Sequence, residues 1–398
     1  IKKSRKYMKK IHINPFYLLM LFYLIVNLVY AIIGFNNGAM EIEFQYKVIE
    51  RSSFLYGFIF QLISLFFITL VYIKKKKKSN NNSLEYSRKV GFFLLFGQIF
   101  YLIVNLMYGA NIAGSSESFS GNPLLNIFFI LLPFDILFFI LGVSLKSKKL
   151  FYLNSVVYLI SNLSRGWMGA PLLLLFAILC RSEGFYINGR NLLKISISTI
   201  VFFLICPYLI ELKWVIRGNY DIIDVIDNVN NFGYREYLLE SVDYVLNRFQ
   251  HVGHVALIFD NSDYLGMKYT HMSDIVPYWA EGLLQSIFMN ITKIDSYLTF
   301  SRFTTMYLFK VSLAQSWTTN VGMASWFFIL GYKVIFYIFY ILLVLFIPFV
   351  FVAKYANRKA FLMLSVFSLF YLFHGWFFAY FTYCTYLLII VFLSKLKI

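Results

Sequence analysis

The chain has 398 residues, of which 60% are apolar and 21% aromatic, and only 14% are charged, against about a quarter in ordinary soluble domains. This composition excludes a soluble globular domain and predicts an integral membrane protein. The formal net charge of +17 does not indicate nucleic-acid binding, because the lysines and arginines form short clusters beside apolar runs, where they set membrane orientation.

Ten apolar segments recur along the chain, and about 20 apolar residues are enough for a helix to cross roughly 30 Å of hydrocarbon. The segments are 15–34, 54–73, 90–109, 124–144, 150–163, 168–180, 195–213, 330–352, 360–375 and 378–394. The first has no small-residue cleavage site, so we expect an uncleaved signal anchor. The pattern predicts an all-α, polytopic integral membrane protein with about ten transmembrane helices.

The fifth and sixth segments are short and are joined at "LSRGW". This part of the chain is expected to form a tight hairpin, two half-length helices or one broken helix.

The basic residues predict the orientation of the chain. Two thirds of the 36 lysines and arginines lie before the first segment, in the connections after the second, fourth, sixth and eighth, or after the last. Cytoplasmic connections carry an excess of Lys and Arg. Both termini are therefore predicted to be cytoplasmic, and "IKKKKKSNNNS" is the clearest marker of that side.

One connection is far longer than the usual few residues. It divides the chain into an N-terminal transmembrane bundle (1–213), a large outer loop domain (214–329) and C-terminal transmembrane helices (330–398). Acidic residues make the loop nearly neutral, so we expect it to be solvated and structured. They are Asp221, Asp224, Asp227, Glu236, Glu240, Asp243, Asp260, Asp263, Asp274, Glu281 and Asp295.

Two segments of the loop are amphipathic. "EYLLESVDYVLNRFQHVGHVALIF" places apolar residues from Leu238 to Phe259 at spacings of three and four, which predicts one helix with Gln250, His251 and His254 on its polar side. "IVPYWAEGLLQSIFMN" is aromatic and amphipathic enough to lie in the membrane interface instead of crossing.

Four arginines belong to the outer side, where basic residues are few: Arg165, Arg217, Arg248 and Arg302. A planar guanidinium offers paired donors that match two phosphate oxygens, so the group predicts a site for a lipid-linked phosphate or diphosphate. The alternatives are that Arg165 and Arg217 anchor their helices at the headgroups, and that each arginine pairs with an acid of the loop.

Histidines form the second candidate group, with His251, His254, His271 and His374 all on the outer side. Imidazole titrates near neutral pH and is a suitable general base. Arg248 and His251 are one helical turn apart, so both side chains are expected to face a shared site. His374, in "YLFHGWFF", fits a catalytic role and a packed structural role equally. The "HVGH" spacing has no third ligand, so no metal is predicted.

Asp135 is the one acid well inside an apolar segment, two residues after Pro133. A carboxylate inside a membrane indicates function by default, for example proton coupling. A structural bond to Arg165 or to a tyrosine is the alternative.

Together these features resemble the Wzy-type O-antigen and capsule polymerases of the bacterial inner membrane. The resemblance covers most of the chain: the number of segments, the cytoplasmic termini and the single long loop. It includes the stretches "SRGWMGAPLLLLFAIL", "WVIRGNYD", "LNRFQHVGHVALIFDN" and "SWTTNVGMASWFFILG".

The resemblance implies a multi-pass inner-membrane glycosyltransferase that uses no nucleotide sugar and no cofactor. A growing glycan on undecaprenyl diphosphate would be transferred to the terminal sugar hydroxyl of a new lipid-linked repeat unit at the periplasmic face. The four arginines would hold the diphosphate, and His251, His254 or Asp260 would act as the base. Membrane lipid and a chain-length regulator protein are the further partners expected.

Two other functions fit the sequence less well. A lipid-linked oligosaccharide flippase or other transporter would use Arg165 and Asp135 inside a transmembrane cavity, but the chain has no internal repeat and little intramembrane charge. An O-antigen ligase would share the donor and the outer site and differ in its acceptor.

Overall fold

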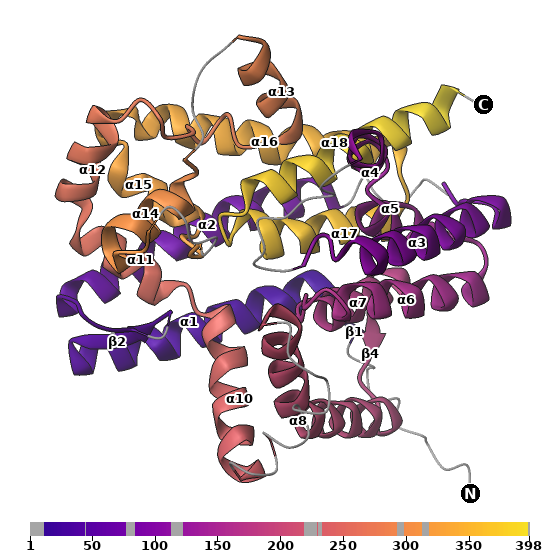
Figure 1. Ribbon diagram of the computed structural model, residues 1–398, viewed down its shortest axis with the longest axis horizontal. Helices are drawn as coiled ribbons and strands as arrows, with labels where there is room; N and C mark the ends of the chain where they lie inside the picture. Colours follow the sequence, from indigo (N-terminus) through magenta and orange to yellow (C-terminus); the bar gives the residue numbers. More distant parts are fainter. Residues whose placement is uncertain are drawn as a thin grey trace, which may run out of the picture.

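The computed structural model describes residues 12–43, 45–76, 84–112, 122–218, 229, 233–292, 298–312 and 318–396. These residues are almost wholly helical (Figure 1), and their only sheets are two short antiparallel pairs. Seven of the described helical segments are long and apolar enough to cross a membrane. The protein is therefore an all-α, multi-pass membrane protein.

The N-terminal part begins with two helices that pack against each other and are joined by a hairpin. Its elements are α1 (Pro15–Asn37), β2 (Ala39–Ile42), β3 (Gln45–Val48), α2 (Arg51–Lys76) and α3 (Arg88–Tyr108). The side-chain oxygen of Asn14 accepts from the amide of Phe16, and Pro15 occupies the first turn, so α1 starts here. Gly38 ends it at φ +64°, a conformation that glycine adopts without steric cost.

The next segments are interrupted. They are α4 (Pro123–Leu131), α5 (Phe134–Leu141), a 3₁₀ turn (Gly142–Ser144), α6 (Lys148–Leu163) and α7 (Ala170–Arg181). Pro133 has no amide hydrogen to continue the α4 ladder, so the helix breaks before Asp135. Of the three arrangements expected at "LSRGW", the structure has two short helices joined by a turn, in which Gly166 adopts φ +74°.

The long connection folds onto the bundle. Before it, β1 (His12–Ile13) pairs with β4 (Phe185–Tyr186), and α8 (Gly189–Gly218) follows β4 in the chain. The helices of the connection are α10 (Tyr234–Phe249), α11 (Val252–Asp260), α12 (Ser262–His271), α13 (Leu283–Ile291), α14 (Phe300–Phe309) and α15 (Trp326–Ile329). In Figure 1, α8 and α10 project together from the body of the molecule. In contrast, α11 packs against α1 and α2.

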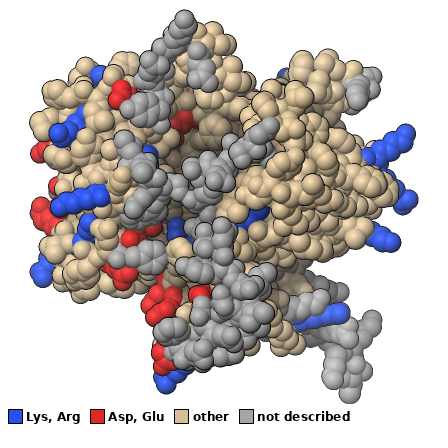
Figure 2. Space-filling view, in the orientation of Figure 1, with Lys and Arg blue, Asp and Glu red and all other residues tan. Residues whose placement is uncertain are grey.

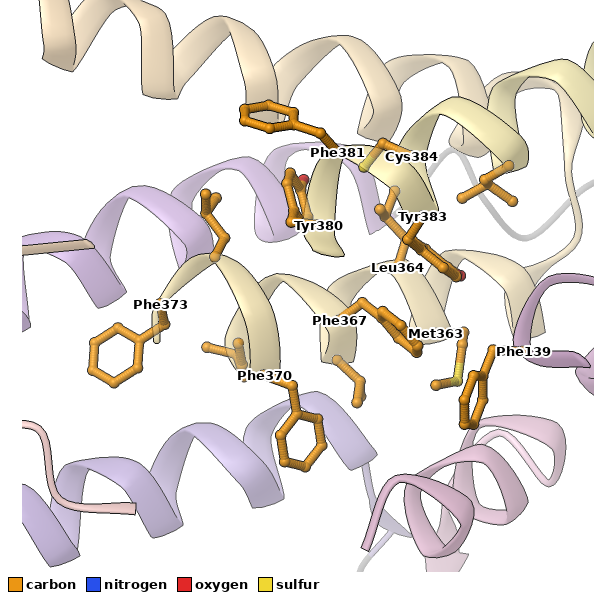
Figure 3. Packing of buried hydrophobic residues seen from close by; sticks show 14 of the residues in the cluster. Phe139, Met363, Leu364, Phe367, Phe370, Phe373, Tyr380, Phe381, Tyr383 and Cys384 are labelled. Carbon is orange, nitrogen blue, oxygen red and sulfur yellow. The ribbon is translucent and has the colours of Figure 1, made fainter. Parts of the chain in front are cut away.

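The core is built around the C-terminal helices, α16 (Val334–Tyr355), α17 (Arg358–Phe367), a π-helical turn (Ser368–Leu372) and α18 (Phe377–Leu396). From Ala360 to Phe367, α17 is buried on all sides, as expected for a helix that is apolar all round. Figure 3 shows its aromatic side chains packed between neighbouring helices. Phe367 stacks on Tyr383 with ring centroids 4.0 Å apart and meets Phe139 at 5.2 Å.

Charged side chains are unevenly distributed. In Figure 2 the acidic side chains gather on the half of the face that holds the loop helices, together with several Lys and Arg side chains, whereas the opposite end shows Lys and Arg without acidic side chains. Lys74, Lys75 and Lys76 form the last turn of α2. The rest of the lysine-rich marker, 77–83, and the acids Asp221, Asp224, Asp227 and Asp295 lie outside the described residues.

The ten predicted segments all coincide with helices, but α6, α7 and α17 are short. Seven described segments satisfy the length needed to span, and α7 has only 12 residues. The number of crossings beyond seven stays a prediction.

Candidate functional site

The predicted amphipathic helix of the loop is broken in two, because a side chain of α1 forms hydrogen bonds with backbone groups in its middle. Asn27, buried in the middle of α1, accepts from the amides of His251 at 2.7 Å and Val252 at 3.0 Å. Its amide nitrogen donates to the carbonyl of Phe249 at 3.1 Å. These bonds end α10 and start α11, so the expectation of one continuous helix was wrong.

Three histidines meet at this break. The rings of His251 and His374 lie with centroids 4.0 Å apart, and those of His251 and His254 are 6.4 Å apart. All three residues are buried. Tyr23 of α1, one helical turn before Asn27, is hydrogen-bonded through its hydroxyl to Nε2 of His374. We call His251, His254, His374 and Tyr23 the histidine cluster.

A second backbone segment fixes His374 in place. The amide of Gly322 donates to the carbonyl of His374 and that of Met323 to Phe373, each at 3.0 Å. Trp376 donates from Nε1 to Asn320 at 2.7 Å. A Cβ on Gly375 would lie 3.0 Å from the backbone of Gly322, so the approach requires glycine. Residues 320–323 and 373–376 therefore form one rigid wall of the site.

Nδ1 of His254 and Nδ1 of His374 have no hydrogen-bond partner among the described residues, and His251 meets only the backbone of Asn320. Leaving a buried polar group unsatisfied costs about 1–3 kcal/mol, and such groups concentrate at functional sites. Burial lowers the pKa of His251 well below its ordinary value, and the neighbouring His374 and His254 lower it further. His251 is therefore neutral at physiological pH, and one of its ring nitrogens is a hydrogen-bond acceptor.

Nε2 of His254 lies 3.3 Å from a carboxylate oxygen of Glu43, in the hairpin that follows α1. His254 is thus oriented through Nε2, and its Nδ1 is buried without a hydrogen-bond partner among the described residues. Among the described residues no three His, Cys, Asp or Glu side chains are grouped so as to hold a metal ion.

Arg248 supplies positive charge next to the histidines. It occupies the last turn of α10, close enough to influence the titration of His251. Its guanidinium lies 5.1 Å from the ring centroid of Tyr244, and no salt bridge to it occurs among the described residues. Lys213 of α8 lies 4.7 Å from the centroid of the same ring and is hydrogen-bonded to the Tyr244 hydroxyl. Two cations therefore contact Tyr244.

Other predicted site residues lie elsewhere. Asp260, at the far end of α11, accepts from the amide of Glu50 at 3.2 Å and the hydroxyl of Ser53 at 3.0 Å. At about 1.5 Å per residue, it is about 13 Å along the helix from His251. The geometry makes Asp260 a cap for the start of α2, not part of the histidine cluster.

The two remaining loop arginines are not brought to the cluster by any described contact. Arg302 lies in the first turn of α14 and donates to the carbonyl of Ser312 at 3.0 Å. Arg217 is in the last turn of α8, and its side chain is outside the described part of the structure. His271, the last residue of α12, is exposed.

Arg165 is buried and paired with Asp135. Its Nη2 lies 2.6 Å from a carboxylate oxygen of Asp135 and 3.1 Å from Asn162, and its guanidinium lies over the ring of Tyr101 at 4.9 Å. The expectation of an outward-facing clamp is not met in this structure, because the donors are used within the bundle. The alternative of a structural Asp135–Arg165 bond describes the geometry.

Sequence reasoning missed Tyr23, Asn27, Glu43 and Asn320, which all contact the candidate site or its wall. The available signal was Asn27, a polar residue in the middle of the otherwise apolar "YLIVNLVY". Buried polar side chains are normally hydrogen-bonded, so a partner outside the helix was to be expected.

No protein-family model matches the chain, and neither the curated proteins nor the solved structures include one with significant similarity to it.

Proposed function

We propose that the protein is a glycosyltransferase of the O-antigen or capsule polymerase type, which acts on polyprenyl-diphosphate-linked oligosaccharides. The observation that carries this proposal is the convergence of Arg248 with His251, His254 and His374. A cation beside the departing diphosphate and a neutral imidazole beside the attacking hydroxyl would both serve transfer from a diphosphate to a hydroxyl.

In the proposed reaction the terminal hydroxyl of a new repeat unit attacks the anomeric carbon of the growing glycan. The bond from that carbon to the diphosphate oxygen breaks as the new glycosidic bond forms. His251 takes the hydroxyl proton, and Arg248 stabilises the charge that develops on the departing diphosphate. His374, bonded to Tyr23, packs against the His251 ring and holds it in position.

The proposed setting is the periplasmic face of a bacterial inner membrane, with both termini cytoplasmic. Supporting this orientation, the lysines of α2 lie in its last turn, at the opposite end of that helix from the hairpin that carries Glu43, and the acids gather with the loop helices (Figure 2). Undecaprenyl diphosphate, membrane lipid and a chain-length regulator are the proposed partners.

The test is the surface polysaccharide ladder of a strain that lacks the gene and carries a plasmid copy. We expect wild type to restore the ladder, and Arg248→Ala and His251→Ala to leave core plus one repeat unit at normal protein level. Matched controls are Arg235→Ala, an exposed arginine on the same helix, and His271→Ala. Both should restore the full ladder.

The same experiment separates the alternatives. Loss of every repeat from the surface, with polymer accumulating on the carrier lipid, indicates a ligase. Loss of every repeat without such polymer indicates a flippase. A full ladder from His251→Ala and Arg248→Ala would refute the proposed site.

A further inference from the structure

A group of aromatic side chains packs next to the 320–323 wall. Trp326 is fully buried and meets Phe300 with ring centroids 4.1 Å apart, and Tyr269 and Tyr278 each at 5.8 Å. Tyr278 in turn meets Tyr337 at 5.0 Å and Tyr340 at 5.3 Å. We call these six residues the aromatic cluster.

The floor and the rim of the aromatic cluster differ in exposure. Trp326, Tyr337 and Phe300 are buried, whereas Tyr269, Tyr278 and Tyr340 keep part of their surface exposed. Figure 2 shows the molecular surface hollowed below α13, the helix that follows Tyr278 in the chain. Partly exposed tyrosines over a buried aromatic floor offer flat apolar area together with hydroxyl groups.

Glu281 is the titratable group of this region. It lies between Tyr278 and the start of α13, and the surrounding protein shields its carboxyl group from water. Its carboxyl group meets the backbone amide of Phe300, at the first turn of α14, and interacts electrostatically with Tyr269, Tyr337 and Tyr340. No described lysine or arginine contributes to its titration. Burial raises the pKa of Glu281 to about 8, so the carboxyl group keeps its proton at neutral pH.

The aromatic cluster and the histidine cluster share one piece of backbone. The hydroxyl of Tyr337 donates to the carbonyl of Met323 at 2.7 Å. The amides of Met323 and Gly322 donate in turn to the carbonyls of Phe373 and His374. The backbone of Gly322 and Met323 therefore lies between Tyr337 of the aromatic cluster and His374 of the histidine cluster.

We propose that Glu281 and the rim tyrosines of the aromatic cluster form a subsite for an uncharged sugar ring, the acceptor of the proposed transfer. The role of the bound sugar as acceptor rests on the proposed function, whereas the binding of a sugar at this place does not. The C–H face of a pyranose packs on tyrosine rings, and a protonated carboxyl group both donates to and accepts from its hydroxyls. Glu281 is a binding and positioning residue in this proposal, and His251 remains the base.

The charge state of the subsite selects the ligand class. A neutral carboxyl group beside aromatic rings, with no described cation contributing to its titration, offers no favourable charge to an acidic sugar. The probes are therefore glucose, galactose and N-acetylglucosamine, tested separately with the full chain in detergent by saturation-transfer NMR. We expect at least one of them to bind through the protons of one ring face.

Two substitutions test the role of the carboxyl group. Glu281→Ala removes the hydrogen bonds and should weaken binding about tenfold, whereas Glu281→Gln keeps a donor and an acceptor and should bind within about threefold of wild type at pH 7. Between pH 7 and pH 9 the protonated fraction of a group with a pKa of about 8 falls about tenfold. Wild-type binding should weaken by that factor, and Glu281→Gln binding should not change.

The same saturation-transfer measurement provides the controls and the results that would contradict the proposal. Tyr278→Ala should abolish binding, whereas Tyr264→Ala, an exposed tyrosine on α12, should not. Absence of binding by all three sugars, or equal binding by wild type, Glu281→Ala and Tyr278→Ala, would overturn the subsite. Arg248→Ala should bind sugar normally, so a full ladder from Arg248→Ala together with sugar binding refutes the proposed transferase site and leaves the subsite standing.

Discussion

Replacing Asn27 by leucine tests the break between α10 and α11. The substitution nearly conserves volume but removes the acceptor of two buried amides, those of His251 and Val252, and the donor to Phe249. Each orphaned amide costs about 1–3 kcal/mol. The free energy that keeps the break closed should therefore fall by about 2–6 kcal/mol, and its centre, about 4 kcal/mol, corresponds to about three orders of magnitude in the opening equilibrium.

Hydrogen exchange of the amides from Phe249 to His254 measures this opening. We expect exchange in Asn27→Leu at least about 30-fold faster than in wild type, from the lower bound of 2 kcal/mol. Ser64→Ala is the matched control, because Ser64 is equally buried in a neighbouring helix but bonds only to Phe60 of its own helix. Exchange within threefold of wild type in Asn27→Leu would refute the assignment of the break to Asn27.

Three further predictions follow from other contacts. Arg165→Ala removes the cation that pairs with the partly buried carboxylate of Asp135 and should destabilise the protein by about 1–3 kcal/mol. A thermal shift no larger than that of the Arg165→Leu, Asp135→Leu double variant would show that the pair does not couple. Asp260→Ala should cost about 1 kcal/mol in thermal stability through the lost cap of α2 and leave the polysaccharide ladder full; loss of the ladder at normal protein level would instead return Asp260 to the catalytic residues. Ile287, on the exposed apolar side of α13, should contact lipid, so a spin label at Ile287Cys should be relaxed by oxygen dissolved in the bilayer, and relaxation only by a water-soluble reagent would contradict this.

The positions of the helices could be read from the sequence because the information is local. A run of apolar residues determines both helix and burial in lipid, as in α1 and α16. The number of membrane crossings is harder to predict from local sequence. The 10-residue helix α17, for example, is buried because other helices surround it. The outcome at "LSRGW" likewise depends on Asp135, 30 residues away along the chain.

The candidate site could be predicted only in part. Arg248, His251 and His254 are three residues apart in the sequence, so their closeness in space could be predicted from helical spacing. The break that separates Arg248 from His251 depends on Asn27, which is 224 residues from His251 in the chain. Glu281 was one acid among many in the loop, and its pKa is raised by burial, which the sequence does not reveal. Such long-range effects leave no periodic pattern in the sequence.

The contact between Tyr23 and His374 joins residues 351 positions apart. Because α1 emerges from the ribosome long before residues 373–376, the histidine cluster has no complete form during synthesis. A chain that stops before residue 373 carries Arg248 and His251 but lacks the turn that bears His374. The histidine cluster therefore forms only after nearly the whole polypeptide has been made, and an unfinished chain in the membrane has no complete cluster.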